Sequence, residues 1–79
     1  IRGDYSKQQI VWDMKLTEAN GIERYPFGPE GIISLKAEAR RSVNDEPHIT
    51  VDTNIGFELF VLYGEKEKKI TVLPGKHTY

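Results

Sequence analysis

The chain alternates apolar and polar positions over several short segments, which is the pattern of half-buried β-strands. The alternation is plainest in residues 8–17, where the apolar side chains on one face are Ile10, Trp12, Met14 and Leu16. The opposite face carries Val11, Asp13, Lys15 and Thr17. We therefore predict a strand here, with Trp12 as its largest core residue, because large aromatic side chains dominate burial in small domains.

Most of the remaining apolar residues fall between His48 and Leu73, where three strands are predicted in series. The first spans residues 48–53, with Ile49 and Val51 pointing inward, and a corner follows at residues 54–56. The third spans residues 69–73, with Ile70 and Val72 inward, after a charged hairpin loop at residues 64–68. A last short strand is expected at residues 76–79.

The middle strand of this series, residues 57–63, is apolar on both faces. Phe57, Leu59, Val61 and Tyr63 alternate on one side, and Phe60 and Leu62 lie on the other. A strand that is apolar on both sides is normally covered on both sides. We therefore predict that Phe60 and Leu62 form a face that docks on another domain.

Turn signals separate residues 18–31 from the strands around them. Asn20-Gly21 predicts a hairpin turn before a short strand at residues 21–25, because both residues tolerate positive φ. The Pro and Gly residues of 26–31 predict a loop or a succession of turns.

Residues 32–43 fit two structures. As a strand they place Ile33, Leu35, Ala37, Ala39 and Val43 on one face, whereas as a helix they place Ile32, Leu35, Ala39 and Val43 on one stripe. Helix propensity favours the helix, and the cleaner alternation and the β-rich surroundings favour the strand. We prefer the strand and keep the helix as the alternative.

Together these elements predict an all-β fold of five to seven antiparallel strands, arranged as a small sandwich or open barrel. Residues 1–7 are polar and are expected to be an N-terminal arm or linker, and residues 8–79 a single β-domain. The length of 79 residues allows one domain with a small core. Because the chain begins at Ile1 without methionine, we expect it to be processed, excised or part of a longer protein.

Composition and charge narrow the classes of partner. The chain has 11 Lys plus Arg and 12 Asp plus Glu, so its net charge of −1 gives no basic footprint for nucleic acid. No run approaches the roughly 20 apolar residues of a membrane-spanning helix, so a soluble domain is expected. The absence of cysteine excludes disulfides and thiolate metal ligands, but it leaves both a cytoplasmic and a secreted location open.

The sequence contains no recognisable catalytic motif, neither a nucleophile elbow nor a phosphate-binding loop. His48 and His77, with Asp45 or Asp52, could hold a metal. The preferred interpretation is that they are two unrelated histidines at the surface or at strand ends. The carboxylates at outward positions are read as solvated: Asp13, Glu38, Asp52 and Glu58. We therefore expect no catalytic residue, metal or cofactor, and an enzyme acting alone is the least favoured class.

Aromatic residues allow a carbohydrate-binding surface, because their rings have an apolar face and a polar edge. Tyr25 and Phe27, in the segment rich in Pro and Gly, are the best candidates for such a platform. The alternative, which we prefer, is that these rings pack back onto the sheet as a plug.

The C-terminal part of the chain resembles the closing β-domain of bacterial glycoside hydrolases that have an (α/α)6 catalytic barrel. The segments that carry the resemblance are Ile49-Thr50-Val51-Asp52-Thr53-Asn54, the aromatic strand Phe57 to Val61, and the ending Pro74-Gly75-Lys76-His77-Thr78-Tyr79. The resemblance covers about the last 35 residues and includes no catalytic residue, since in that family the catalytic carboxylates lie in the barrel.

The resemblance implies a non-catalytic accessory β-domain of a carbohydrate-active enzyme, packed against the catalytic domain of the same protein. Two alternatives stay open at this point. One is an independent carbohydrate-binding module that uses Tyr25 and Phe27, and the other is a structural or protein-interaction β-domain.

Overall fold

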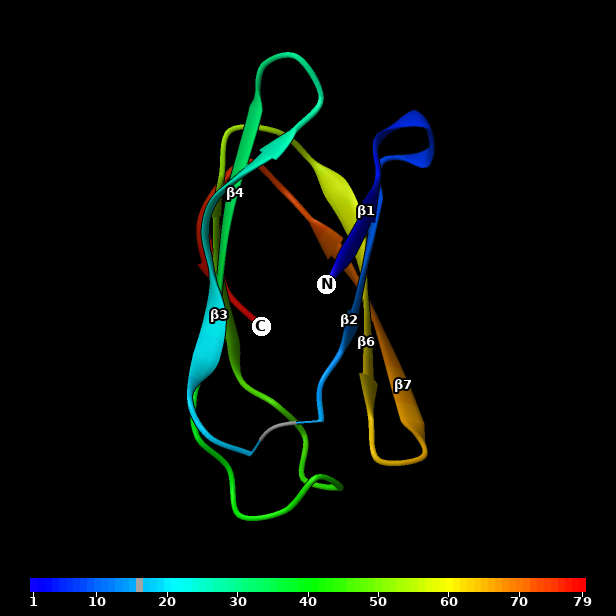
Figure 1. The fold of residues 1–79 in the computed structure, drawn as a ribbon. Coiled ribbons are helices and arrows are strands. Elements are labelled where there is room, and N and C mark those ends of the chain that lie inside the picture. Colours follow the sequence, from blue (N-terminus) through cyan, green and yellow to red (C-terminus); the bar gives the residue numbers. More distant parts are fainter. Residues whose placement is uncertain (16) are drawn as a thin grey trace.

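The computed structural model describes residues 1–15 and 17–79, which form a sandwich of two four-stranded sheets (Figure 1). The β6 sheet has the order β1 (Arg2–Asp4), β2 (Gln9–Asp13), β6 (Phe57–Tyr63) and β7 (Lys66–Val72). The β5 sheet has the order β3 (Asn20–Phe27), β4 (Gly31–Ala37), β5 (Ile49–Thr53) and β8 (Gly75–Thr78). A single 3-10 turn, η1 (Tyr5–Lys7), joins β1 to β2. The predicted all-β fold is confirmed.

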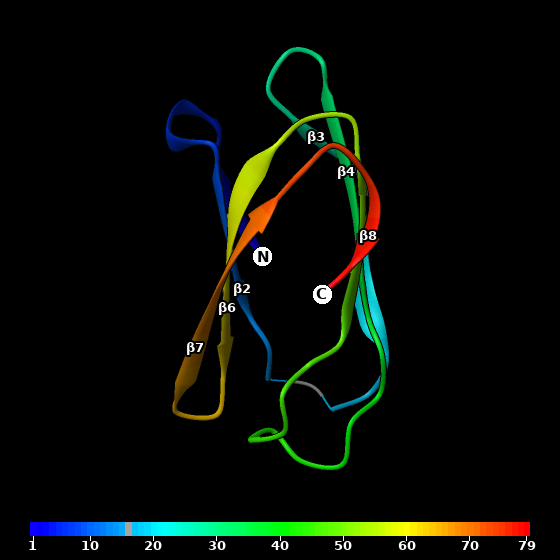
Figure 2. The same cartoon turned by 180° about the vertical axis from the view of Figure 1, so that it is seen from behind.

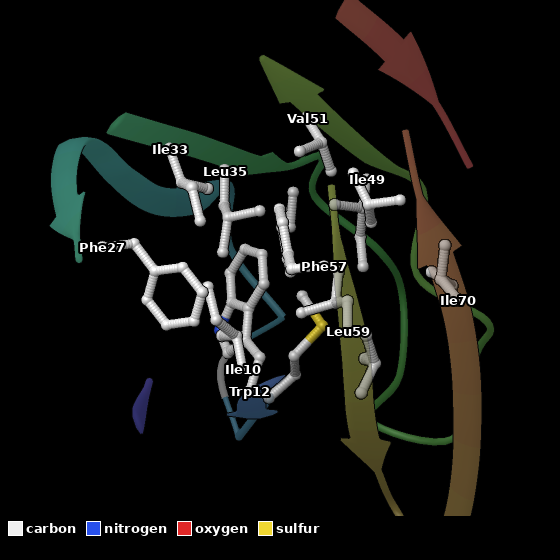
Figure 3. Close-up of a cluster of buried hydrophobic side chains, with 14 of the residues drawn as sticks. Ile10, Trp12, Phe27, Ile33, Leu35, Ile49, Val51, Phe57, Leu59 and Ile70 are labelled. Atoms are coloured by element: carbon white, nitrogen blue, oxygen red, sulfur yellow. The ribbon is translucent and has the colours of Figure 1, made fainter. Parts of the chain in front are cut away.

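The core lies between the sheets and consists of the inward positions of the alternating strands. Figure 3 shows side chains of both sheets pointing toward one another across this layer. The buried residues from the β6 sheet and its flank are Ile10, Trp12, Met14, Phe57, Leu59, Val61, Tyr63, Ile70 and Val72. Those from the β5 sheet are Phe27, Ile33, Leu35, Ala37, Ile49 and Val51. Leu16, predicted on the same face as Trp12, lies outside the described residues.

The last four strands form one long hairpin that contributes to both sheets. One arm of this hairpin is β5 followed by β6, and the other arm is β7 followed by β8. β6 pairs with β7 in one sheet, and β5 pairs with β8 in the other. The two arms therefore cross between the sheets side by side, at the predicted corner of residues 54–56 and at Leu73–Pro74 (Figure 2). At the corner, the Thr53 hydroxyl accepts a hydrogen bond from the Ile55 amide at 3.1 Å and donates one to the Ile55 carbonyl at 2.8 Å.

Two features of the sheets differ from the prediction. The described residues form eight strands rather than five to seven, and β2 pairs with β6 in parallel, with Gln9 opposite Glu58 and Asp13 opposite Leu62. Parallel neighbours need a long connection, and here the three strands β3 to β5 provide it.

Residues 1–7, expected to be an arm or linker, contain the edge strand β1, which pairs with β2, and the 3-10 turn η1.

The prediction of a hairpin turn at Asn20-Gly21 was wrong. β2 and β3 belong to different sheets, and Asn20 and Gly21 start β3 opposite Ala37 and Lys36. A side chain on Gly21 would collide with the backbone carbonyl of Leu35, so glycine permits a close strand contact here instead of a turn. β3 instead forms a hairpin with β4, and the turn of that hairpin lies at residues 28–30, within the predicted loop.

Residues 32–43 begin as a strand and end as a loop. β4 runs to Ala37, with Ile33, Leu35 and Ala37 buried as the strand phasing predicted, and no helix occupies the described part of this segment. The phasing fails beyond Ala37, since Ala39 and Val43 are exposed. The chain leaves the sheet there and forms a loop over one end of the sandwich.

The hairpin between β6 and β7 is tighter than predicted. Tyr63 pairs with Lys66, which leaves Gly64 and Glu65 as a two-residue turn, and β7 therefore starts within the segment expected to be a loop. Gly64 has a φ of +57°, and glycine is preferred at the first position of such turns because it adopts this conformation without strain.

Leu59 and Leu73 offer a matched test of the core. Leu59 is fully buried in β6, whereas Leu73 is 60% exposed at the second crossing. Leu59→Ala is expected to lower the free energy of unfolding by about 2–5 kcal/mol, because it leaves a cavity between the sheets. Leu73→Ala should change it by less than about 0.5 kcal/mol. Urea titration followed by Trp12 fluorescence measures both, and equal losses would contradict this assignment of the core.

Candidate functional site

The outer face of the β6 sheet carries an apolar patch of three neighbouring side chains, Val11, Phe60 and Leu62. Val11 in β2 lies opposite Phe60 in β6, and Leu62 is the next outward position of β6. All three are half-buried. We call this surface the β6 outer face.

Charged and polar side chains surround the apolar patch. Lys69 lies opposite Phe60 in β7, with its Nζ 5.8 Å from the centre of the Phe60 ring and 4.0 Å from Glu58 Oε2. The Thr71 hydroxyl donates to the same carboxylate at 3.4 Å. An apolar centre with a polar rim is the usual anatomy of a protein–protein interface.

The predicted docking residues Phe60 and Leu62 thus lie on one surface, as their outward phase requires. Val11 also belongs to this surface, although the sequence alone placed it only on the mainly polar face of its strand and gave no link to β6. Its contribution depends on the parallel register between β2 and β6, which joins residues far apart in the sequence. The pattern of neighbouring residues in β2 does not predict which strand pairs with it.

The two candidates for a carbohydrate platform, Tyr25 and Phe27, do not lie open on the surface. Phe27 is 2% exposed and belongs to the core, and Tyr25 is half-buried and packs against the core. The rings lie in an aromatic cluster, in which Phe27 is 5.7 Å from Tyr5, 6.1 Å from Phe57 and 6.5 Å from Tyr25, measured between ring centres. Stacking on a sugar needs an open ring face, so the packed plug is what the structure shows for Phe27.

β1 covers this aromatic cluster from the side. A Cβ atom on Gly3 would lie 2.8 Å from the Tyr25 hydroxyl and 3.0 Å from the Phe27 ring. The N-terminal segment therefore closes the space beside Tyr25 and Phe27. The bulge that precedes Tyr25 keeps it on the inward side, opposite Ile33.

The histidines and carboxylates considered above do not gather at one place. Within residues 1–15 and 17–79, no group of three or more His, Cys, Asp or Glu side chains could hold a metal ion. His77 contacts the Pro74 carbonyl at 3.2 Å, and His48 is exposed. The outward carboxylates are exposed at Asp13, Glu38 and Asp52 and half-buried at Glu58. The described part of the chain contains no helix long and apolar enough to cross a membrane.

The loop of residues 38–48 joins β4 to β5 of the β5 sheet, and hydrogen bonds fasten it to the β6 sheet and to the connection between β2 and β3. Arg40 donates from Nη2 to the Met14 carbonyl at 2.9 Å and from its backbone amide to the Thr17 carbonyl at 2.8 Å. On the other side of the loop, Lys68 of β7 donates to Glu46 at 2.7 Å. These contacts close the end of the sandwich opposite the two crossings.

Three comparisons of the chain with known proteins found no match. No protein-family model, no curated protein and no solved structure matches the chain.

The contact between Glu46 and Lys68 predicts a dependence of stability on pH. The hydrogen bond from Lys68, and next its positive charge, hold the pKa of the Glu46 carboxyl below its ordinary value of 4.5. Because the pKa is lower in the folded state, the contact stabilises the fold above pH 4.5 and is lost as the pH falls through the folded pKa. Glu46→Gln should therefore destabilise the chain at neutral pH and leave its stability unchanged in acid.

Urea titrations at neutral pH and at an acidic pH at which Glu46 is protonated in the folded chain measure this difference, and added salt should shrink it because the pair is exposed. Glu65→Gln is the control, since Glu65 forms no ion pair within the described residues. A loss for Glu46→Gln that is equally large at both pH values would show that the contact does not act through charge.

Proposed function

We propose that this chain is a non-catalytic β-sandwich module that docks on a neighbouring protein domain through the β6 outer face. The observation that carries the proposal is the apolar patch of Val11, Phe60 and Leu62 on the solvent side of a sheet. A sheet that covers a core on one side normally presents alternating polar residues on the other. β6 departs from this rule at two of its three outward positions, Phe60 and Leu62, and follows it at the third, Glu58.

The small size of the patch fits a partner within the same polypeptide. Interfaces between domains of one chain are smaller and more polar than those of permanent complexes. A covalent connection also raises the effective concentration of the partner, so a few apolar contacts are enough to hold two domains together. Lys69 and Glu58 at the rim would then select the orientation more than they add affinity.

The partner that we propose is a catalytic domain of a carbohydrate-active enzyme. The support for this choice is the resemblance of the C-terminal segments to the closing β-domain of (α/α)6-barrel glycoside hydrolases. An independent carbohydrate-binding module built on Tyr25 and Phe27 is less well supported, because Phe27 is buried and Tyr25 faces the core.

The proposal predicts that Phe60→Thr combined with Leu62→Thr weakens docking without unfolding the chain. Threonine keeps a high preference for strands but removes the apolar area. The test is isothermal titration of the 79-residue chain against the neighbouring domain encoded in the same reading frame. The double variant is expected to bind at least about tenfold more weakly, as for residues at the centre of an interface.

Ile32→Thr is the matched control, because Ile32 is 41% exposed on the outer face of the other sheet. Circular dichroism verifies that both variants remain folded. Unchanged affinity of the double variant, or an equal loss in the control, would refute docking through the β6 outer face. A reading frame that encodes no further domain would refute a partner within the same polypeptide.

A further inference from the structure

The outer face of the β5 sheet contains a shallow groove of about 430 Å³. A second depression of about 300 Å³ continues it and shares Arg24, Ser34 and Asp52. The charged and hydroxyl-bearing side chains that line the groove are Glu23, Arg24, Ser34, Lys36, Thr50, Asp52, Lys76 and Thr78. They come from all four strands of the sheet, so the groove crosses the whole face.

Three cationic side chains meet in this groove without carboxylate partners. In residues 1–15 and 17–79, no carboxylate oxygen lies within 4.0 Å of the charged nitrogens of Arg24, Lys36 or Lys76. This holds even though Lys76 lies directly opposite Asp52 in the pairing of β5 with β8. Elsewhere in the described chain, Lys15, Lys68 and Lys69 do form ion pairs. The groove therefore has positive charge available for a ligand.

The groove also offers hydrogen-bond acceptors and hydroxyls beside these cations. Asp52 lies at its centre, opposite Ser34 on one side and Lys76 on the other. Thr50 and Thr78 face each other across the next step of the sheet, with their hydroxyl oxygens 3.4 Å apart. Carboxylates accept hydrogen bonds from ligand hydroxyls, whereas Lys and Arg donate to oxyanions.

A β-bulge places Arg24 at the groove. The register of β3 against β4 shifts between Ile22 and Tyr25, so that Glu23 and Arg24 both line the groove. Arg24 has a φ of +52°, a conformation that is unfavourable for a residue with a side chain, and its amide donates to Ser34 at 3.0 Å. Strained residues of this kind gather at binding and catalytic sites, where the strain fixes a side chain in place.

We propose that this groove binds a polyhydroxylated ligand that carries an oxyanion, which is the chemistry of an acidic saccharide. Arg24, Lys36 and Lys76 contact the carboxylate or sulfate group, and Asp52 accepts hydrogen bonds from the sugar hydroxyls. Nucleic acid fits less well, since no aromatic side chain lines the groove for base stacking and two carboxylates lie beside the cations. The groove is on the sheet opposite the β6 outer face, so this inference does not depend on the proposed docking function.

The test compares two triple variants of equal charge. Arg24→Gln, Lys36→Gln and Lys76→Gln together remove the cations of the groove. Arg2→Gln, Lys15→Gln and Arg41→Gln together remove three exposed cations that do not line it. Isothermal titration with oligogalacturonate, dextran sulfate and neutral dextran separates carboxylate, sulfate and uncharged sugars.

We expect the unsubstituted chain to bind an acidic saccharide and not neutral dextran, and the groove variant to bind at least about tenfold more weakly than the control variant. A preference for oligogalacturonate over dextran sulfate would identify a carboxylate as the anionic group, and the reverse a sulfate. Equal weakening in both triple variants would show non-specific attraction and overturn the site. The absence of binding to either acidic saccharide would overturn it as well.

Arg24 provides a second and independent test. Arg24→Gly relieves the backbone strain and removes the cation, so its melting temperature is expected to equal or exceed that of the unsubstituted chain while binding of the acidic saccharide weakens. Arg24→Ala keeps the strain and also removes the cation, so it should melt at a lower temperature than Arg24→Gly. Full affinity of Arg24→Gly would overturn the role of Arg24 in binding. An equal or lower melting temperature of Arg24→Gly relative to Arg24→Ala would overturn the strain argument.

Discussion

The folded long hairpin of β5 to β8 is the constraint on which the rest of the structure depends. Its two arms cross between the sheets together, so each arm contributes a strand to both halves of the sandwich. The inward residues of one arm therefore face those of its own continuation, as Ile49 and Leu59 do in Figure 3. β4 then adds to β5 and β2 adds to β6, and each sheet grows outward from this hairpin.

The hairpin also separates two surfaces of different character. The outward side of β6 carries Phe60 and Leu62, whereas the outward side of β5 carries Thr50 and Asp52. A single continuous ribbon thus presents an apolar patch on one side of the molecule and a charged groove on the other. Because the core lies between them, a ligand on one face leaves the opposite face free for a second partner.

Local pattern predicted the strands and much of the core, because alternation is a property of neighbouring residues. Ile10, Trp12, Ile49, Val51 and Leu59 all lie inward as their phase required. Pairing between distant strands was not predictable in the same way, since the parallel register of β2 with β6 depends on contacts across the whole chain. For the same reason Asn20-Gly21, a strong local turn signal, could start a strand instead.

Of the two candidate surfaces, one depends on the pattern within a single strand and the other depends on pairing between strands. Phe60 and Leu62 were predictable because one strand showed both of its apolar faces in sequence. The groove on the β5 sheet was not, since Arg24, Lys36 and Lys76 are unremarkable separately and only sheet pairing brings them together. The proline and glycine neighbours of Phe27 indicate a turn, but they do not predict the direction of its ring. The structure shows that the ring is buried, so Phe27 does not form a platform.

The parallel pairing of β2 with β6 has a consequence for the order in which the chain folds. Gln9 pairs with Glu58, a separation of 49 positions, whereas the β6–β7 hairpin closes over two residues. Closing a long loop is entropically costly and slows folding, so local hairpins form first and β2 docks late. During synthesis, Ile10 and Trp12 leave the ribosome long before β6 exists to receive them. The first strands of this domain to be made are thus the last to be buried, and until then they are the part of the domain most exposed to aggregation.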